Sequence, residues 1–83
     1  MEKQWFVYLL KCQDGSFYTG VTKDIDARMN AHVNGKGSKY VYNKGFEELL
    51  RVKPCKNKSD ACKCEYAIKQ LPKKNKLNWF DNN

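Results

Sequence analysis

The fold is decided by three short pieces of sequence: WFVYLL at residues 5–10, QDG at residues 13–15 and FYTGVT at residues 17–22. The first piece is apolar throughout, which is typical of a strand that is buried on both faces. The third is rich in aromatic and β-branched residues, which favour strands. Because the Asp-Gly pair between them is a turn signal, the whole stretch predicts a β-hairpin.

Two loop lengths fit this hairpin. A two-residue turn of Asp14 and Gly15 would place Tyr8 and Tyr18 on opposite faces of the sheet. A three-residue loop with a bulge at Gly15 would place both phenols on one face, with Gly20 opposite Tyr8 and room there for a substrate backbone. The local sequence allows both registers, but only the second brings the two phenols into a joint site.

A helix is predicted after the hairpin. Asp24 is a good N-cap and Gly35 a good residue just beyond the C-terminus, while Ile25, Met29 and Val33 form an apolar stripe. The helix should therefore pack this stripe against the sheet.

Arg28 and His32 lie one turn apart on one shoulder of that stripe. The next residues, NGKGSKY at 34–40, are predicted to form a polar, basic loop whose backbone N–H groups and lysines either hold phosphates or remain solvated. A third strand is predicted over residues 46–53, ending before Pro54, although its two glutamates fit a short helix nearly as well.

Two further helices are predicted near the C-terminus. Ser59 would cap a helix from Asp60 to about Leu71, with Glu65 at the edge of its buried stripe. Pro72 suits the first turn of the following helix. The buried stripe would consist of Ala61, Cys64, Ala67, Ile68 and Leu71, and the last helix would run through Leu77, Trp79 and Phe80. With no internal repeat or linker, we expect a single domain over residues 1–83.

Composition limits the classes of function. The 83 residues include 16 Lys+Arg and 9 Asp+Glu, which gives a net charge of +7 and attracts polyanions such as nucleic acid, although solubility alone would also explain it. Since no apolar run approaches the ~18 residues of a membrane span and residues 1–3 do not open a secretory signal, we expect a cytoplasmic protein with no membrane role. The spacing of Cys12, Cys55, Cys62 and Cys64 fits no zinc clip, which favours reduced thiols.

An ordered set of motifs resembles the GIY-YIG endonuclease superfamily, in particular its small stand-alone members. The set is VYL at 7–9, YTG at 18–20, Arg28 and His32 on one helix and Glu65 on another, and the likeness runs from about Trp5 to Leu77. It implies an α+β fold, with a small three-stranded antiparallel sheet flanked by about three helices. The triplets depart from GIY and YIG, but both tyrosines and the last glycine remain.

The resemblance also implies a catalytic set. Tyr8 would be the general base, Arg28 would contact the scissile phosphate, and Tyr18 and His32 would hydrogen-bond the water or phosphate or tune Tyr8. Glu65 would bind one Mg²⁺ or Mn²⁺ ion. Asn75 and Asn78 compete for a further asparagine that the superfamily often carries after its glutamate.

The expected activity is metal-dependent hydrolysis of phosphodiester bonds in DNA, either structure-selective or weakly specific, and linked to repair or recombination. Two alternatives are a nucleic-acid-binding module without turnover and a subunit that is active only with a partner protein, which could also supply specificity. We expect a monomer or weak homodimer. The residues expected to contact nucleic acid are Gly20, Lys36, Lys39, Tyr40, Lys69, Lys73 and Asn78.

Each candidate also has an ordinary structural interpretation. Tyrosines in hairpins are usually half-buried core residues with a wet hydroxyl. Glu65 and Lys69 have the spacing of an i,i+4 helix ion pair, and His32 beside an apolar stripe could be purely structural. The nuclease hypothesis therefore depends on all of these groups meeting around one cavity.

Overall fold

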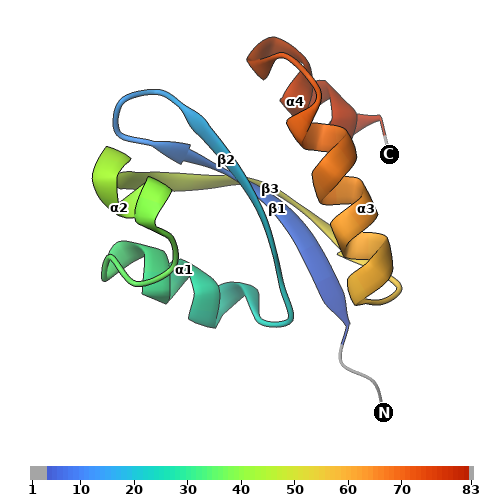
Figure 1. The fold of residues 1–83 in the computed structure, drawn as a ribbon, viewed down its shortest axis with the longest axis horizontal. Helices are drawn as coiled ribbons and strands as arrows, with labels where there is room; N and C mark the ends of the chain where they lie inside the picture. The colour runs from blue at the N-terminus through green and yellow to red at the C-terminus, as the bar shows by residue number, and fades with distance from the viewer. Residues whose placement is uncertain (1–3, 83) are drawn as a thin grey trace.

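The computed structural model describes residues 4–82, so residues 1–3 and 83 of the predicted domain lie outside the described residues. Three strands form one antiparallel sheet in the order β2-β1-β3: β1 (Trp5–Cys12), β2 (Phe17–Thr22) and β3 (Phe46–Cys55). Helices α1 (Ile25–Val33) and α2 (Lys39–Lys44) pack on one face, and α3 (Lys58–Lys69) and α4 (Lys73–Asp81) on the other (Figure 1). The predicted α+β fold is confirmed, and over residues 4–82 no helix is long and apolar enough to cross a membrane.

The central strand β1 supplies both halves of the core. Val7 and Leu9 pack with the apolar residues of α3 and α4, while Tyr8 and Leu10 pack with those of α1 and α2. All four side chains have 0% exposure. The unbroken apolar run of β1 follows from this position, because a strand covered by helices on both faces has no solvent-facing side.

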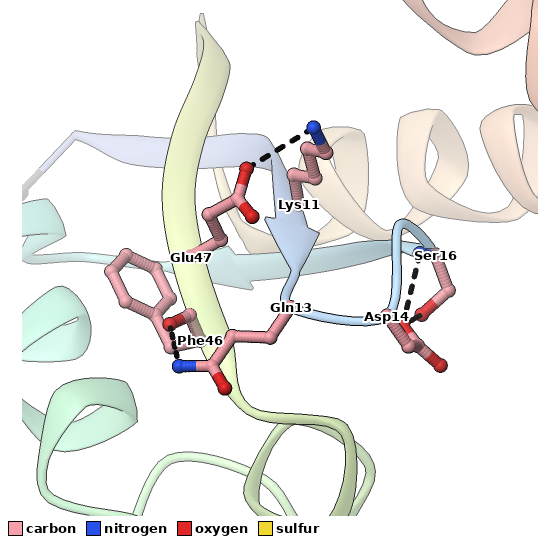
Figure 2. Close-up of polar contacts among 6 residues, drawn as sticks. All are labelled: Lys11, Gln13, Asp14, Ser16, Phe46 and Glu47. Carbon is pink, nitrogen blue, oxygen red and sulfur yellow. Dashed lines mark hydrogen bonds and ion pairs between the residues drawn. The ribbon is translucent and has the colours of Figure 1, made fainter.

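The turn of the hairpin is the three-residue loop. The N–H of Cys12 donates to the carbonyl oxygen of Ser16 at 2.8 Å, and Gly15 has a φ of +88°, which glycine adopts without strain. The carboxylate of Asp14 accepts from both the N–H and the hydroxyl of Ser16 (Figure 2). The two-residue turn, the other interpretation of the same residues, is therefore wrong.

This loop sets the register of the sheet. Tyr8 lies opposite Gly20 and Leu10 lies opposite Tyr18, so both phenols share the face that α1 and α2 cover. A joint site required both phenols on one face of the sheet, and this register provides it.

Helix α2 was not predicted. Its sequence was assigned to a polar loop up to residue 40, yet six residues are helical and Val41 is the one that the core buries. A six-residue helix offers too few positions to display a 3.6-residue period. Over residues 4–82 the sheet therefore carries four helices, where about three were expected.

Strand β3 continues past its predicted end. It includes Pro54, which lies opposite Phe6, and reaches Cys55. Proline is tolerated there because β3 is an edge strand, where an N–H is not needed by a further neighbour. The short-helix alternative for this segment is wrong.

Helix α3 begins one residue before its predicted cap. Asn57, and not Ser59, is the N-cap, and its side chain accepts from the N–H of Asp60 at 2.8 Å. The carboxylate of Asp60 accepts from the N–H of Lys56 in return, an arrangement like a capping box. The helix ends at Lys69, before Leu71.

The buried faces of two helices differ from the predicted stripes. In α1, Val33 is 65% exposed and His32 is buried in its place. In α3, Ala67 is exposed. The face of α1 is turned because His32 is drawn inward by a polar partner on β1, which hydrophobic periodicity does not detect.

Candidate active site

Three aromatic rings meet on the face of the sheet under α1. The hydroxyl of Tyr8 lies 2.9 Å from Nε2 of His32, a hydrogen bond that is buried. The ring of Tyr18 lies 6.4 Å from that of Tyr8 and 5.8 Å from that of His32. Because Tyr8 is fully buried and Tyr18 half-buried, Tyr18 presents the more accessible phenol.

Gly20 makes this arrangement possible. A Cβ on Gly20 would contact the hydroxyl oxygen of Tyr8 and lie 2.6 Å from its Cζ, so the phenol fills the space above the glycine. The sequence had suggested that this space was left for a substrate backbone, with Gly20 as a nucleic-acid contact. In the structure it is occupied by Tyr8, and Gly20 is buried.

Replacing Gly20 with alanine is expected to displace the ring of Tyr8. Overpacking of a closed core costs about 1–3 kcal/mol, so the free energy of unfolding in urea should fall by this amount. The same substitution in a Tyr8→Leu background should cost less, because leucine ends before the position of the phenol hydroxyl. Equal costs in the two backgrounds would show that the two residues are not coupled.

His32 is held in its neutral form. Burial lowers the pKa of His32, and the charge of Arg28 lowers it further, from its ordinary value of 6.5. The ring stacks on Phe46 with an interplanar angle of 4°, and Nδ1 lies against Gly37. Over the described residues Nδ1 has no hydrogen-bond partner. Because a buried N–H without an acceptor is especially unfavourable, we place the proton on Nε2, which then donates to the oxygen of Tyr8.

The electrostatics of Tyr8 involve the other predicted residues. Burial raises the pKa of Tyr8, and Tyr18 and the negative charge of Glu65 raise it too, whereas Arg28 lowers it through its charge and a side-chain hydrogen bond. Arg28 and Glu65 therefore both act on the phenol, one from α1 and the other from α3. The balance favours the protonated phenol, so a general-base role requires a further positive influence.

Glu65 also makes the ordinary contact that its spacing suggested. Its carboxylate lies 3.5 Å from Nζ of Lys69, and its side chain is 24% exposed. Over residues 4–82 no group of three or more His, Cys, Asp or Glu side chains could form a closed metal cage. Mg²⁺ is nevertheless often held by a single carboxylate together with waters and phosphate oxygens of the substrate. Glu65 therefore fits a Mg²⁺ ion whose remaining ligands come from water and substrate.

Tyr40 joins the aromatic cluster. Its ring stacks on Tyr18 at 5.8 Å with an interplanar angle of 27°, and it remains 41% exposed. Nζ of Lys44 lies 5.9 Å from the centre of the Tyr40 ring, a contact that the sequence had not singled out. Lys36 and Lys39 are exposed nearby in the chain, before and at the start of α2. Of these predicted nucleic-acid contacts, Tyr40 is the one shown to stack on the rings.

The remaining predicted contacts lie on α3 and α4. Lys69 pairs with Glu65, and Nζ of Lys73 lies 4.8 Å from the centre of the Phe17 ring. Asn78 is exposed on α4 and Asn75 is half-buried. Apart from Gly20 on β2, the predicted nucleic-acid residues therefore divide into those at or just before α2 and those on α3 and α4.

One lysine of α4 has a structural role. Nζ of Lys76 donates to the carbonyl oxygen of Ile68 at 2.8 Å, in the last turn of α3. Burial lowers the pKa of Lys76, and the charge of Lys69 lowers it further. Lys76 therefore caps the C-terminal end of α3.

Comparison with known proteins identifies the class to which this fold and site belong. Residues 4–78 match the model of the GIY-YIG catalytic domain. The chain belongs to the GIY-YIG family of nucleases, which confirms the resemblance seen in the motifs.

Its relatives are small proteins of similar length. It is 48% identical over 77 residues to the UPF0213 protein OB0043 of Oceanobacillus iheyensis, covering 93% of this chain and 90% of that protein. The solution NMR structure of EF2693 from E. faecalis is 34% identical with a TM-score of 0.68, covering 98% of this chain and 86% of that one. The NMR structure of the UPF0213 protein BH0048 from Bacillus halodurans is 36% identical with a TM-score of 0.58, covering 96% and 85%.

Proposed function

We propose that the protein is a metal-dependent endonuclease that hydrolyses phosphodiester bonds in DNA. The observation that supports this most is the convergence on Tyr8. Its hydroxyl is bonded to His32, its ring lies beside Tyr18, and the charges of Arg28 and Glu65 both act on it. These are the groups that hydrolysis needs, namely proton acceptors, a guanidinium for phosphate charge and a carboxylate for a cation.

The protein side chains divide the chemistry between them. Arg28 would bind a phosphoryl oxygen through its planar fork, and it also lowers the pKa of Tyr8. The Nε2–H of His32 supports negative charge on the Tyr8 oxygen, which as a phenolate takes the proton of the attacking water. Because Tyr8 is fully buried, a catalytic role for its hydroxyl requires a rearrangement that opens it to substrate.

Glu65 would hold the divalent cation. A bound Mg²⁺ or Mn²⁺ would act as a Lewis acid on the phosphoryl oxygens and would offset the negative charge that now raises the pKa of Tyr8. The net charge of +7 favours the approach of a polyanion.

A second candidate function is a nucleic-acid-binding module without turnover. The observation that favours it is that Tyr8 is buried and that its pKa is raised. A core tyrosine with no catalytic role would show the same two properties. A subunit whose active site is opened by a partner protein would share this feature.

A cleavage panel distinguishes these functions. Supercoiled, duplex, flap, junction and single-stranded DNA are incubated with Mg²⁺, Mn²⁺ or EDTA, and binding is measured on the same substrates. We expect cleavage with a divalent cation and none with EDTA, and a preference for branched DNA would support a role in repair or recombination. Tight, salt-sensitive binding without cleavage of any substrate would contradict the proposal and favour the binding module.

A further inference from the structure

A pocket of about 420 Å³ is lined by His32 together with residues at the end of α1, in α2 and at the start of β3. Val41 and Phe46 supply apolar walls, and the ring of Phe46 stacks on that of His32. Tyr42 and Gln13 line it from α2 and from the residue after β1. The pocket shares His32 with the three-ring cluster, and Val41 and Phe46 with the core around Tyr8. The proposed function leaves the rest of its lining unused.

The aromatic wall of the pocket is both exposed and held in place. Tyr42 is 67% exposed, although it belongs to a helix that packs on the core. A Cβ on Gly35 would lie 2.7 Å from Cδ2 of the Tyr42 ring, so the ring rests directly on the glycine backbone. Gly35 has a φ of +76°, which limits its replacement by other residues. The Tyr42 ring is therefore supported from one side by the Gly35 backbone while much of it remains exposed.

Side-chain amides provide polar groups at the same pocket. The amide of Gln13 lies over Gly45, where a Cβ would come within 2.7 Å of Oε1. Its Nε2 donates to the carbonyl oxygen of Phe46 at 3.4 Å, as Figure 2 shows. Asn34, at the end of α1, is exposed and also lines the pocket. Amides can donate and accept at once, as the edge of a nucleobase requires.

These features suit one kind of ligand. An aromatic face, amide groups and apolar walls are how proteins hold an unstacked base, and the volume falls within the ~300–1,000 Å³ of small-molecule sites. We propose that this pocket binds one unpaired nucleobase of the substrate strand. A base inside a duplex is stacked and cannot enter it. The inference rests on the proposed function and narrows its substrate class to DNA with an unpaired nucleotide at the site of cleavage.

Binding without turnover tests the pocket separately from the nuclease activity. A fluorescein-labelled single-stranded DNA is titrated in EDTA, and anisotropy gives the Kd. We expect Tyr42→Ala to weaken binding roughly 5- to 100-fold, as loss of one base–aromatic stack does, and Tyr42→Phe to bind like the wild type. The matched control is Tyr66→Ala on α3, since Tyr66 is 69% exposed but lies outside the pocket. Tyr42→Ala should leave duplex affinity unchanged.

An abasic scan locates the base. Removing single bases along the strand should weaken wild-type binding most at one position, and that position should lose its effect in Tyr42→Ala. Equal binding by Tyr42→Ala and wild type, or an abasic effect that is the same in both, would overturn the pocket assignment. Neither result depends on cleavage, so a protein that binds in this way but never cuts DNA would refute only the proposed nuclease.

Discussion

Replacing Tyr8 with phenylalanine is expected to slow DNA cleavage by about 10²- to 10⁴-fold, the usual contribution of a general base. The ring and its packing over Gly20 remain, while the oxygen that His32 bonds at 2.9 Å is lost. Single-turnover cleavage of the best substrate at saturating Mg²⁺ measures the chemical step directly.

Stability must be measured beside cleavage for this variant. Without the hydroxyl, the buried ring of His32 has no remaining hydrogen-bond partner over the described residues, which costs about 1–2 kcal/mol in urea unfolding. The matched control is Tyr66→Phe, because that phenol is 69% exposed. A Tyr8→Phe protein that loses this stability but cuts at the wild-type rate would reduce Tyr8 to a structural residue.

The second large effect is expected from Glu65→Gln, which keeps the size of the side chain and removes its charge. If the carboxylate holds the cation, cleavage should fall at least about 100-fold, since Lewis-acid stabilisation is worth several kcal/mol. Raising the Mn²⁺ concentration should recover part of the activity.

The ordinary interpretation of Glu65 predicts the opposite pattern. The Glu65–Lys69 pair is partly solvent-exposed, and i,i+4 pairs of this kind contribute only about 0.3–0.5 kcal/mol. The free energy of unfolding of Glu65→Gln should therefore lie within about 0.5 kcal/mol of that of the wild type. Glu48→Gln, an exposed position on β3, serves as the control. Unchanged cleavage in Glu65→Gln would leave this residue with the ion pair alone.

Much of the fold could be predicted because its signals are local. The apolar run of β1, the turn residues around Gly15 and the cap at Asp24 each act within a few positions of the chain. The hairpin register stayed open, because both loop lengths suit the same residues until α1 covers one face. Helix α2 was missed because its place depends on Val41 entering a core that residues far along the chain build.

The candidate site residues could be named from the sequence, but their surroundings could not. The order of five residues along the chain matches the GIY-YIG motifs, namely Tyr8, Tyr18, Arg28, His32 and Glu65. Their catalytic roles stay predictions. Burial of Tyr8, and its ring above Gly20, depend on how the helices close over the sheet. The pocket at Tyr42 is likewise assembled from four segments, and none of them carries a signal on its own.

The irregular outer strand of the sheet has a consequence for how copies of the chain meet. β3 carries Pro54, two register shifts against β1, and exposed Glu47, Glu48 and Arg51. Such features oppose the addition of another chain's strand and hence growth into fibrils. At high concentration this edge of the sheet is therefore expected to resist amyloid-like stacking with further copies of the chain.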